Sequence, residues 1–178
     1  MSRSLLSLYR LDRAALQRFS GELEATLAAN DRVGLAALLE LDGDAALPER
    51  LEAVHVFLLP PSATPAGELF DAADRAAKKL AMRRVFESDN PALEGRLRAF
   101  DALREDAVAA TLVDRLLSPK RLPWYLRRPG RSGGWLPPEM RAELNRRLGS
   151  LESLLPPEIR SFARGLAQID GDAVVLGS

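Results

Sequence analysis

Apolar positions recur every three or four residues along most of the chain, which is the spacing of one face of an α-helix. This pattern predicts an amphipathic helix over Asp12–Ala29, with Asp12 as its N-cap, and a short second helix over Val33–Leu41. A third helix is expected over Thr64–Phe86. The spacing then predicts one long helix over Pro91–Leu117, which at 1.5 Å per residue would span about 40 Å.

Two short apolar stretches do not keep a clear helical spacing. Val54–Leu59 fits either a helix or a strand, and the helix is favoured because Pro48-Glu49 is a good helix opening. Ala173–Leu176 has the composition of a short strand near the C-terminus, and Ser4–Tyr9 is its expected partner. The ends of the chain are therefore expected to meet in a small sheet.

The last two predicted helices, Pro137–Leu148 and Pro156–Gln168, open with the same phrase, Leu-Pro-Pro-Glu. Pro and Glu suit the first turn of a helix, so the repeat is interpreted as one opening used twice rather than as a duplication. With 178 residues, the chain is long enough for one domain with a real core. The expected fold is mainly α: a single domain, residues 1–178, with six or seven helices around Pro91–Leu117 and a minor two-strand sheet joining the termini.

The composition removes several classes of site. The chain has no cysteine and one histidine, which excludes disulfides, iron-sulfur clusters, cysteine nucleophiles and multi-histidine metal sites. Lys plus Arg equals Asp plus Glu at 25 each, so a surface built as a whole for nucleic acid is not expected. No apolar run approaches the roughly 18 residues of a membrane helix, and Arg10 interrupts the N-terminal one. No metal or cofactor is expected, and the expected location is the cytoplasm.

Three motifs invite a catalytic or metal interpretation and are not accepted. Ser132 lies in Gly130–Gly134, a match to G-x-S-x-G, but no strand precedes it as a nucleophile elbow requires. His55 has apolar neighbours and is interpreted as a buried residue rather than a base. The Asp-Gly-Asp phrases at 42–44 and 170–172 lack the later oxygen ligands of a calcium loop and are interpreted as turns.

The segment Ser118–Pro138 differs from the rest of the chain, and we call it the basic-aromatic segment. It carries five cationic side chains and no acidic one, interleaved with aromatic rings and interrupted by proline and glycine. Arg, Trp and Tyr together are typical of protein interfaces and also of single-stranded nucleic-acid surfaces. The predicted partner-binding residues are Trp124, Tyr125, Arg127, Arg128, Arg131 and Trp135.

The function expected from this segment is that of a non-catalytic, cytoplasmic protein-binding module of the adaptor, antitoxin or immunity type. The rings would enter pockets of a partner protein with an acidic surface, while the arginines pair with carboxylates at the rim. Three alternatives stay open: the rings fold back onto the protein itself, the segment binds nucleic acid, or scattered carboxylates and arginines form an enzyme pocket. The sequence does not predict an oligomeric state.

Overall fold

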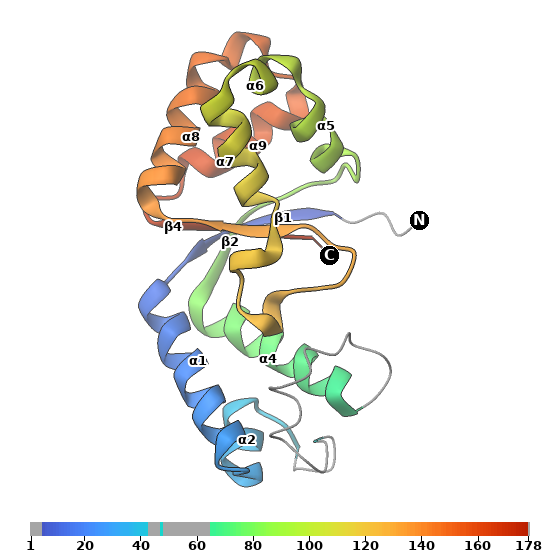
Figure 1. Cartoon of the computed structure of the whole chain (residues 1–178), viewed down its shortest axis with the longest axis vertical. Coiled ribbons are helices and arrows are strands. Elements are labelled where there is room, and N and C mark those ends of the chain that lie inside the picture. Colours follow the sequence, from blue (N-terminus) through green and yellow to red (C-terminus); the bar gives the residue numbers. More distant parts are fainter. Residues whose placement is uncertain (1–4, 43–46, 48–64, 178) are drawn as a thin grey trace. The chain divides into compact units, whose positions relative to one another are not determined.

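A computed structural model describes residues 5–42, 47 and 65–177 of the chain (Figure 1). The chain forms two compact units. Unit 1 contains Met1–Leu11, Arg83–Leu122 and Gly130–Ser178, and unit 2 contains Asp12–Met82 and Pro123–Pro129. The basic-aromatic segment therefore contributes to both units. His55 and the stretch Val54–Leu59, which fitted either a helix or a strand, lie outside the described residues.

Unit 1 is built on an antiparallel sheet with the strand order β2-β1-β4-β3. Its strands are β1 (Leu6–Leu11), β2 (Met82–Glu87), β3 (Gly133–Leu136) and β4 (Asp172–Gly177). β1 lies antiparallel to β4 with Leu6 opposite Gly177, and β3 lies antiparallel to β4 with Gly133 opposite Leu176. The strands at the two ends of the chain do pair, but they form the middle of a four-stranded sheet. The predicted mainly helical bundle with a minor two-strand sheet is therefore wrong, and the fold is mixed α/β.

One face of this sheet is covered by a layer of helices (Figure 1). The layer contains α5 (Leu93–Ala99), α6 (Asp101–Glu105), α7 (Ala107–Leu116), α8 (Pro138–Ser150) and α9 (Pro157–Ala167). Leu6, Leu8, Ala173 and Val175 face it from the sheet, and all four are buried. The two predicted C-terminal helices are found as α8 and α9. Each begins with a proline and has apolar residues recurring on its inner face, which are the two features that predict it.

The long helix expected over Pro91–Leu117 is instead three helices. Phe100 and Asp106 both have extended backbones, with ψ angles of 112° and 99°, and they separate α5, α6 and α7. Asp106 caps α7 by accepting hydrogen bonds from the Val108 and Ala109 amides at 3.0 and 3.1 Å. Arg147 of α8 holds the same carboxylate at 2.5 Å, and this bond is the main reason why the pKa of Asp106 is lowered. The spacing of apolar residues predicts one continuous helix because it does not register the capping residue that starts a new helix at Asp106.

The predicted Thr64–Phe86 helix also stops early. Helix α4 (Pro65–Ala81) ends at Ala81, and the next six residues form β2. The Ser88 amide donates to the Leu6 carbonyl at 2.8 Å, and the Phe86 ring lies edge-on to Phe162 of α9 with centroids 5.9 Å apart. β-Branched and aromatic residues favour a strand, and here pairing with β1 overrides the helical spacing.

Glycine allows α7 to lie directly on β3. A Cβ atom at Gly134 would lie 2.3 Å from the Leu116 carbonyl oxygen and 2.4 Å from that of Arg115. Such a distance is far below any van der Waals contact, and the atoms in the way belong to the backbone. The sequence suggests only a loop at the Gly133-Gly134 pair, whereas in the structure the pair begins an edge strand.

Unit 2 is formed by helices α1 (Arg13–Ala28), α2 (Arg32–Leu38) and α4, together with η2 (Trp124–Leu126), a single 3-10 turn. Asp12 caps α1 through the Ala15 amide at 2.9 Å, as the sequence predicts. The buried face of α1 is the predicted one and consists of Leu16, Phe19, Leu23 and Leu27.

Candidate binding surfaces

In unit 2 the aromatic rings of the basic-aromatic segment face inward. Trp124 lies edge-on to Phe70 of α4 with ring centroids 4.8 Å apart, and Tyr125 lies edge-on to Phe19 of α1 at 5.5 Å. Tyr125 is 1% exposed. Its hydroxyl lies 2.6 Å from the Ser20 hydroxyl, and burial raises the pKa of Tyr125 to about 12. These two rings therefore attach the segment to the core of unit 2.

The arginines of the same stretch differ in their surroundings. The Arg128 guanidinium lies 2.6 Å from the Asp71 carboxylate and 3.6 Å from that of Asp74, both on α4. Only 19% of the Arg128 side chain is exposed, so its charge is largely matched within unit 2. Arg127, in contrast, is exposed.

In unit 1 the third ring is also used internally. The Trp135 indole N–H donates to the Asp172 carboxylate at 2.7 Å, from β3 to β4. Asp172 is a buried carboxylate at 6% exposure, so this bond satisfies a group that is costly to bury alone. Ser132, just before β3, bonds Glu94 of α5 through its hydroxyl, and Arg131 next to it is exposed.

The six predicted residues are thus divided between the units. Trp124, Tyr125, Arg127 and Arg128 belong to unit 2, and Arg131 and Trp135 belong to unit 1. Within unit 2, Tyr125 is buried, Trp124 is half-buried against Phe70, and Arg127 is exposed. Within unit 1, Arg131 is exposed, while Trp135 is half-buried and bonded.

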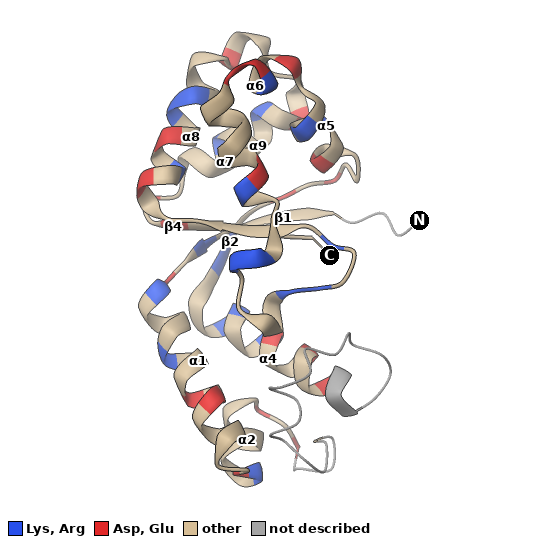
Figure 2. Ribbon diagram, in the orientation of Figure 1, with Lys and Arg blue, Asp and Glu red and all other residues tan. Residues whose placement is uncertain are grey.

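In unit 1 some arginines pair with carboxylates of the same unit, and others have no such partner among the described residues. In its helical layer, ion pairs join Arg98 to Asp114 at 2.9 Å, Arg146 to Glu143 at 2.7 Å, and Arg96 to Glu158. Arg121 and Arg131 of the basic-aromatic segment are exposed, and neither has a carboxylate within ion-pair distance in the part of the chain that the structure describes. Figure 2 shows blue and red mixed on α5–α9 and blue alone on η1 (Pro119–Arg121).

Arg115, in the last turn of α7, adds to this positive charge. Burial, and after it the nearby charge of Arg121, lowers the pKa of Arg115. Its Nε atom is buried and has no hydrogen-bond partner among the described residues. Like charges held together on one surface favour an external anion or carboxylate.

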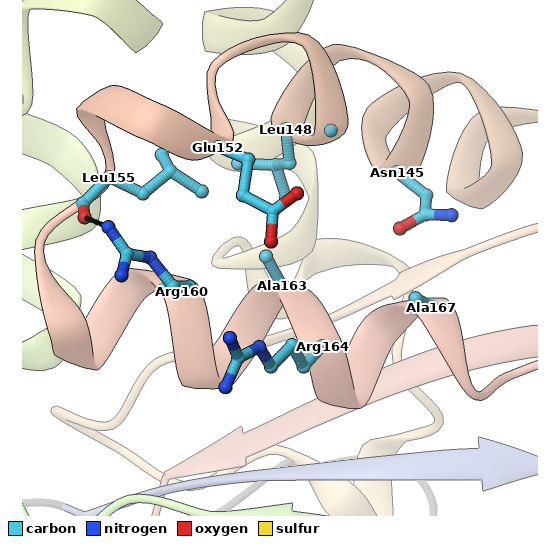
Figure 3. A pocket seen from close by; sticks show the side chains of 9 residues that line it. Asn145, Leu148, Glu152, Leu155, Arg160, Ala163, Arg164 and Ala167 are labelled. Atoms are coloured by element: carbon cyan, nitrogen blue, oxygen red, sulfur yellow. Dashed lines mark hydrogen bonds between the residues drawn. The ribbon is translucent and has the colours of Figure 1, made fainter.

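A groove between α8 and α9 is a second candidate surface, which the sequence did not indicate (Figure 3). It has a volume of about 110 Å³. Asn145 and Glu152 point into it from the side of α8, and Arg160 and Arg164 line it from α9 (Figure 3). The only sequence signal is the spacing of Arg160 and Arg164 by four residues, which places both on one side of α9.

A further hollow of about 210 Å³ lies where α5, α6 and α7 meet, with Arg98, Arg104 and Asp114 at its edge. Pockets for drug-sized ligands are usually about 300–1,000 Å³, so both hollows suit a side chain or a small ion better than a substrate of that size. Among the described residues, no cluster of His, Asp and Glu has the grouping of a metal site. None of the described helices combines the length and apolar character needed to cross a bilayer.

No protein-family model, curated protein or solved structure matches the chain. Support for a function therefore comes from the residues of the chain itself.

Proposed function

We propose that the chain is a non-catalytic, cytoplasmic protein-binding module of the adaptor, antitoxin or immunity type, and that its basic-aromatic segment pairs with an acidic surface of its partner. One observation carries the proposal. Arg121 and Arg131 are exposed without a described carboxylate partner, whereas Arg98 and Arg146 of the helical layer pair with acids of the same unit. The segment itself contains no acidic residue that could neutralise them.

In this proposal the aromatic residues hold the backbone of the segment in place rather than enter pockets of the partner. Tyr125 and Trp124 pack against α1 and α4, and the Trp135 indole bonds Asp172. Rings held in this way fix the backbone that carries the arginines. Binding then orders fewer groups, and a pre-ordered surface loses less entropy when its partner docks.

Nucleic acid is the less favoured partner. Proteins that bind single strands stack bases on exposed aromatic rings, which contribute about 1–3 kcal/mol per base. Tyr125 is 1% exposed, and the other two rings of the segment have intramolecular contacts. Phosphate contacts alone would give weak binding that falls steeply with salt. The two hollows described in unit 1 suit a side chain or a small ion, so neither of them supports an enzyme.

The test is affinity capture from the native host with the wild type, with an Arg121→Glu/Arg131→Glu double variant, and with Arg104→Glu. Arg104 is a suitable control because it is exposed and its pair with Asp101, at 3.7 Å, is also exposed. We expect the partner to be lost with the double variant and kept with the control. Reversing an acidic residue of the captured partner should restore binding to the double variant.

Two results would contradict the proposal. One is recovery of the same partners by the wild type and the double variant. The other is capture that nuclease treatment abolishes, with an affinity for oligonucleotides that falls steeply between about 50 and 200 mM salt, which would identify a nucleic-acid binder.

A further inference from the structure

The groove between α8 and α9 has an apolar floor sized for one aliphatic side chain. Its volume is about 110 Å³. A cavity of roughly 150 Å³ takes a benzene ring, so this groove suits a branched aliphatic group better than an aromatic one. Its apolar lining residues are Leu148, Gly149, Leu155, Ala163 and Ala167, and the two leucines among them, which are buried, form its floor.

The rim of the groove carries cations that unit 1 does not neutralise. Arg164 is exposed and has no carboxylate within ion-pair distance in the described ranges. Arg160 donates from Nη2 to the Leu155 carbonyl at 3.0 Å, which leaves its charge without an acidic partner among the same residues. On the neighbouring helix α8, Arg146 and Arg147 both pair with Glu143. Two arginines without a described acidic partner, Arg160 and Arg164, therefore line the groove.

Glu152 supplies an acceptor at the same place. Its side chain points toward Ala163 of α9 in Figure 3, and Arg160 and Arg164 belong to the same helix. Glu152 forms no ion pair or hydrogen bond through its carboxylate with the part of the chain that the structure describes. An acceptor, apolar side chains and two cations thus line the same groove.

We propose that this groove binds the C-terminal residue of a peptide when that residue is aliphatic. The side chain enters the apolar floor, the terminal carboxylate pairs with Arg164 and Arg160, and the amide N–H donates to Glu152. A carboxylate bound by guanidinium groups forms charge-assisted hydrogen bonds, which are the stronger kind. The groove contains no residue of the basic-aromatic segment, so this inference does not depend on the function proposed for that segment.

N-acetyl-L-leucine is the smallest probe that carries all three groups. Titration into the ¹⁵N-labelled full chain should give saturable shifts of the Asn145 side-chain amide and of the Ala163 and Arg164 backbone amides. N-acetyl-L-leucinamide has no carboxylate, and acetate has no side chain. We expect each to bind at least about fivefold more weakly, because each lacks one of the interactions of the probe.

Two variants test the assignment of the groups, and a third is the control. Arg164→Gln should weaken the probe about five- to tenfold, and Ala163→Leu should abolish its shifts by filling the floor. Arg146→Gln, on the same helix pair but already matched by Glu143, should bind as the wild type does. The proposal is overturned if no saturable shift occurs in the wild type, if the amide binds as tightly as the acid, or if Arg146→Gln weakens binding as much as Arg164→Gln.

Discussion

The basic-aromatic segment is held differently in the two units. In unit 1, Gly134 lies so close to the end of α7 that two carbonyl oxygens occupy the position of a Cβ atom. In unit 2, the segment is held by side chains: Trp124 and Tyr125 pack against rings of α4 and α1, and Arg128 pairs with two aspartates. Backbone contact cannot yield to a larger residue, whereas side-chain contact is shared among several groups. The two parts should therefore differ in their tolerance of substitution.

Gly134→Ala should have the largest effect. The new methyl group would meet the Leu116 carbonyl oxygen at 2.3 Å, and no side chain can move to relieve it. Overpacking usually costs about 1–3 kcal/mol, and a backbone obstruction belongs at the upper end or beyond it. We expect the free energy of unfolding to fall by about 3 kcal/mol or more, with a melting temperature lower by roughly 10 °C. Urea and thermal denaturation measure both.

Gly149→Ala is the matched control in the same unit. Gly149 lies in α8, and a Cβ atom there would meet no other atom within 4 Å. Alanine in a helix is favoured over glycine by about 1 kcal/mol at most, so this variant should be unchanged or slightly more stable. Equal destabilisation by the two alanines would show that α7 does not lie on β3 as described.

Trp135→Phe should have the next-largest effect on the free energy of unfolding. Phenylalanine keeps an aromatic ring on β3 but removes the N–H that donates to Asp172 at 2.7 Å. Asp172 is 6% exposed, and a buried acceptor that loses a partner costs about 1–3 kcal/mol. Urea denaturation followed by far-UV circular dichroism measures this loss. A variant as stable as the wild type would mean that water replaces the indole at Asp172.

Tyr125→Phe probes the corresponding group of unit 2 and should cost less. The ring stays in place, and only the hydrogen bond with the Ser20 hydroxyl is lost. One such bond contributes about 1 kcal/mol. Ser20 is only half-buried, so water can satisfy it in the variant. Urea denaturation at neutral pH gives the difference directly.

The same variant has a distinct pH dependence. Burial raises the pKa of Tyr125 to about 12, above the value of about 10 for a free tyrosine. The folded state thus holds the phenol proton more tightly, and this stabilisation is complete below pH 10 and disappears between pH 10 and 12. Wild type should lose stability over that range, and Tyr125→Phe should lose less. Parallel pH curves for the two proteins would contradict the buried environment of this hydroxyl.

The elements that the sequence predicts well are those whose signals are local. Helices α1, α8 and α9 have a capping residue or an opening proline next to a regular apolar face, and all three form where expected. The sequence also predicts that the terminal strands β1 and β4 pair, because both are short apolar stretches without helical spacing, and the structure confirms this pairing.

The elements that the sequence misses depend on distant partners. β2 follows α4 without a break, and only β1, about 75 residues earlier, makes it a strand. Asp106 divides the expected rod because it caps α7 and is held by Arg147, 41 residues away. The composition of the basic-aromatic segment is visible in the sequence, but the rings it turns inward can be identified only once Phe19, Phe70 and Asp172 are placed.

Neutralising one arginine at a time separates structural charges from exposed ones, with the smallest expected effects. Arg128→Gln removes a guanidinium that is 19% exposed and leaves Asp74, a mostly buried acid, with Lys78 as its cation. We expect a loss of about 1 kcal/mol. Arg131→Gln, at an exposed position, should change stability by less than about 0.5 kcal/mol. If Arg131→Gln destabilised the chain as much as Arg128→Gln, Arg131 would be a structural residue of unit 1. Its role as an exposed charge for binding a partner would then be contradicted.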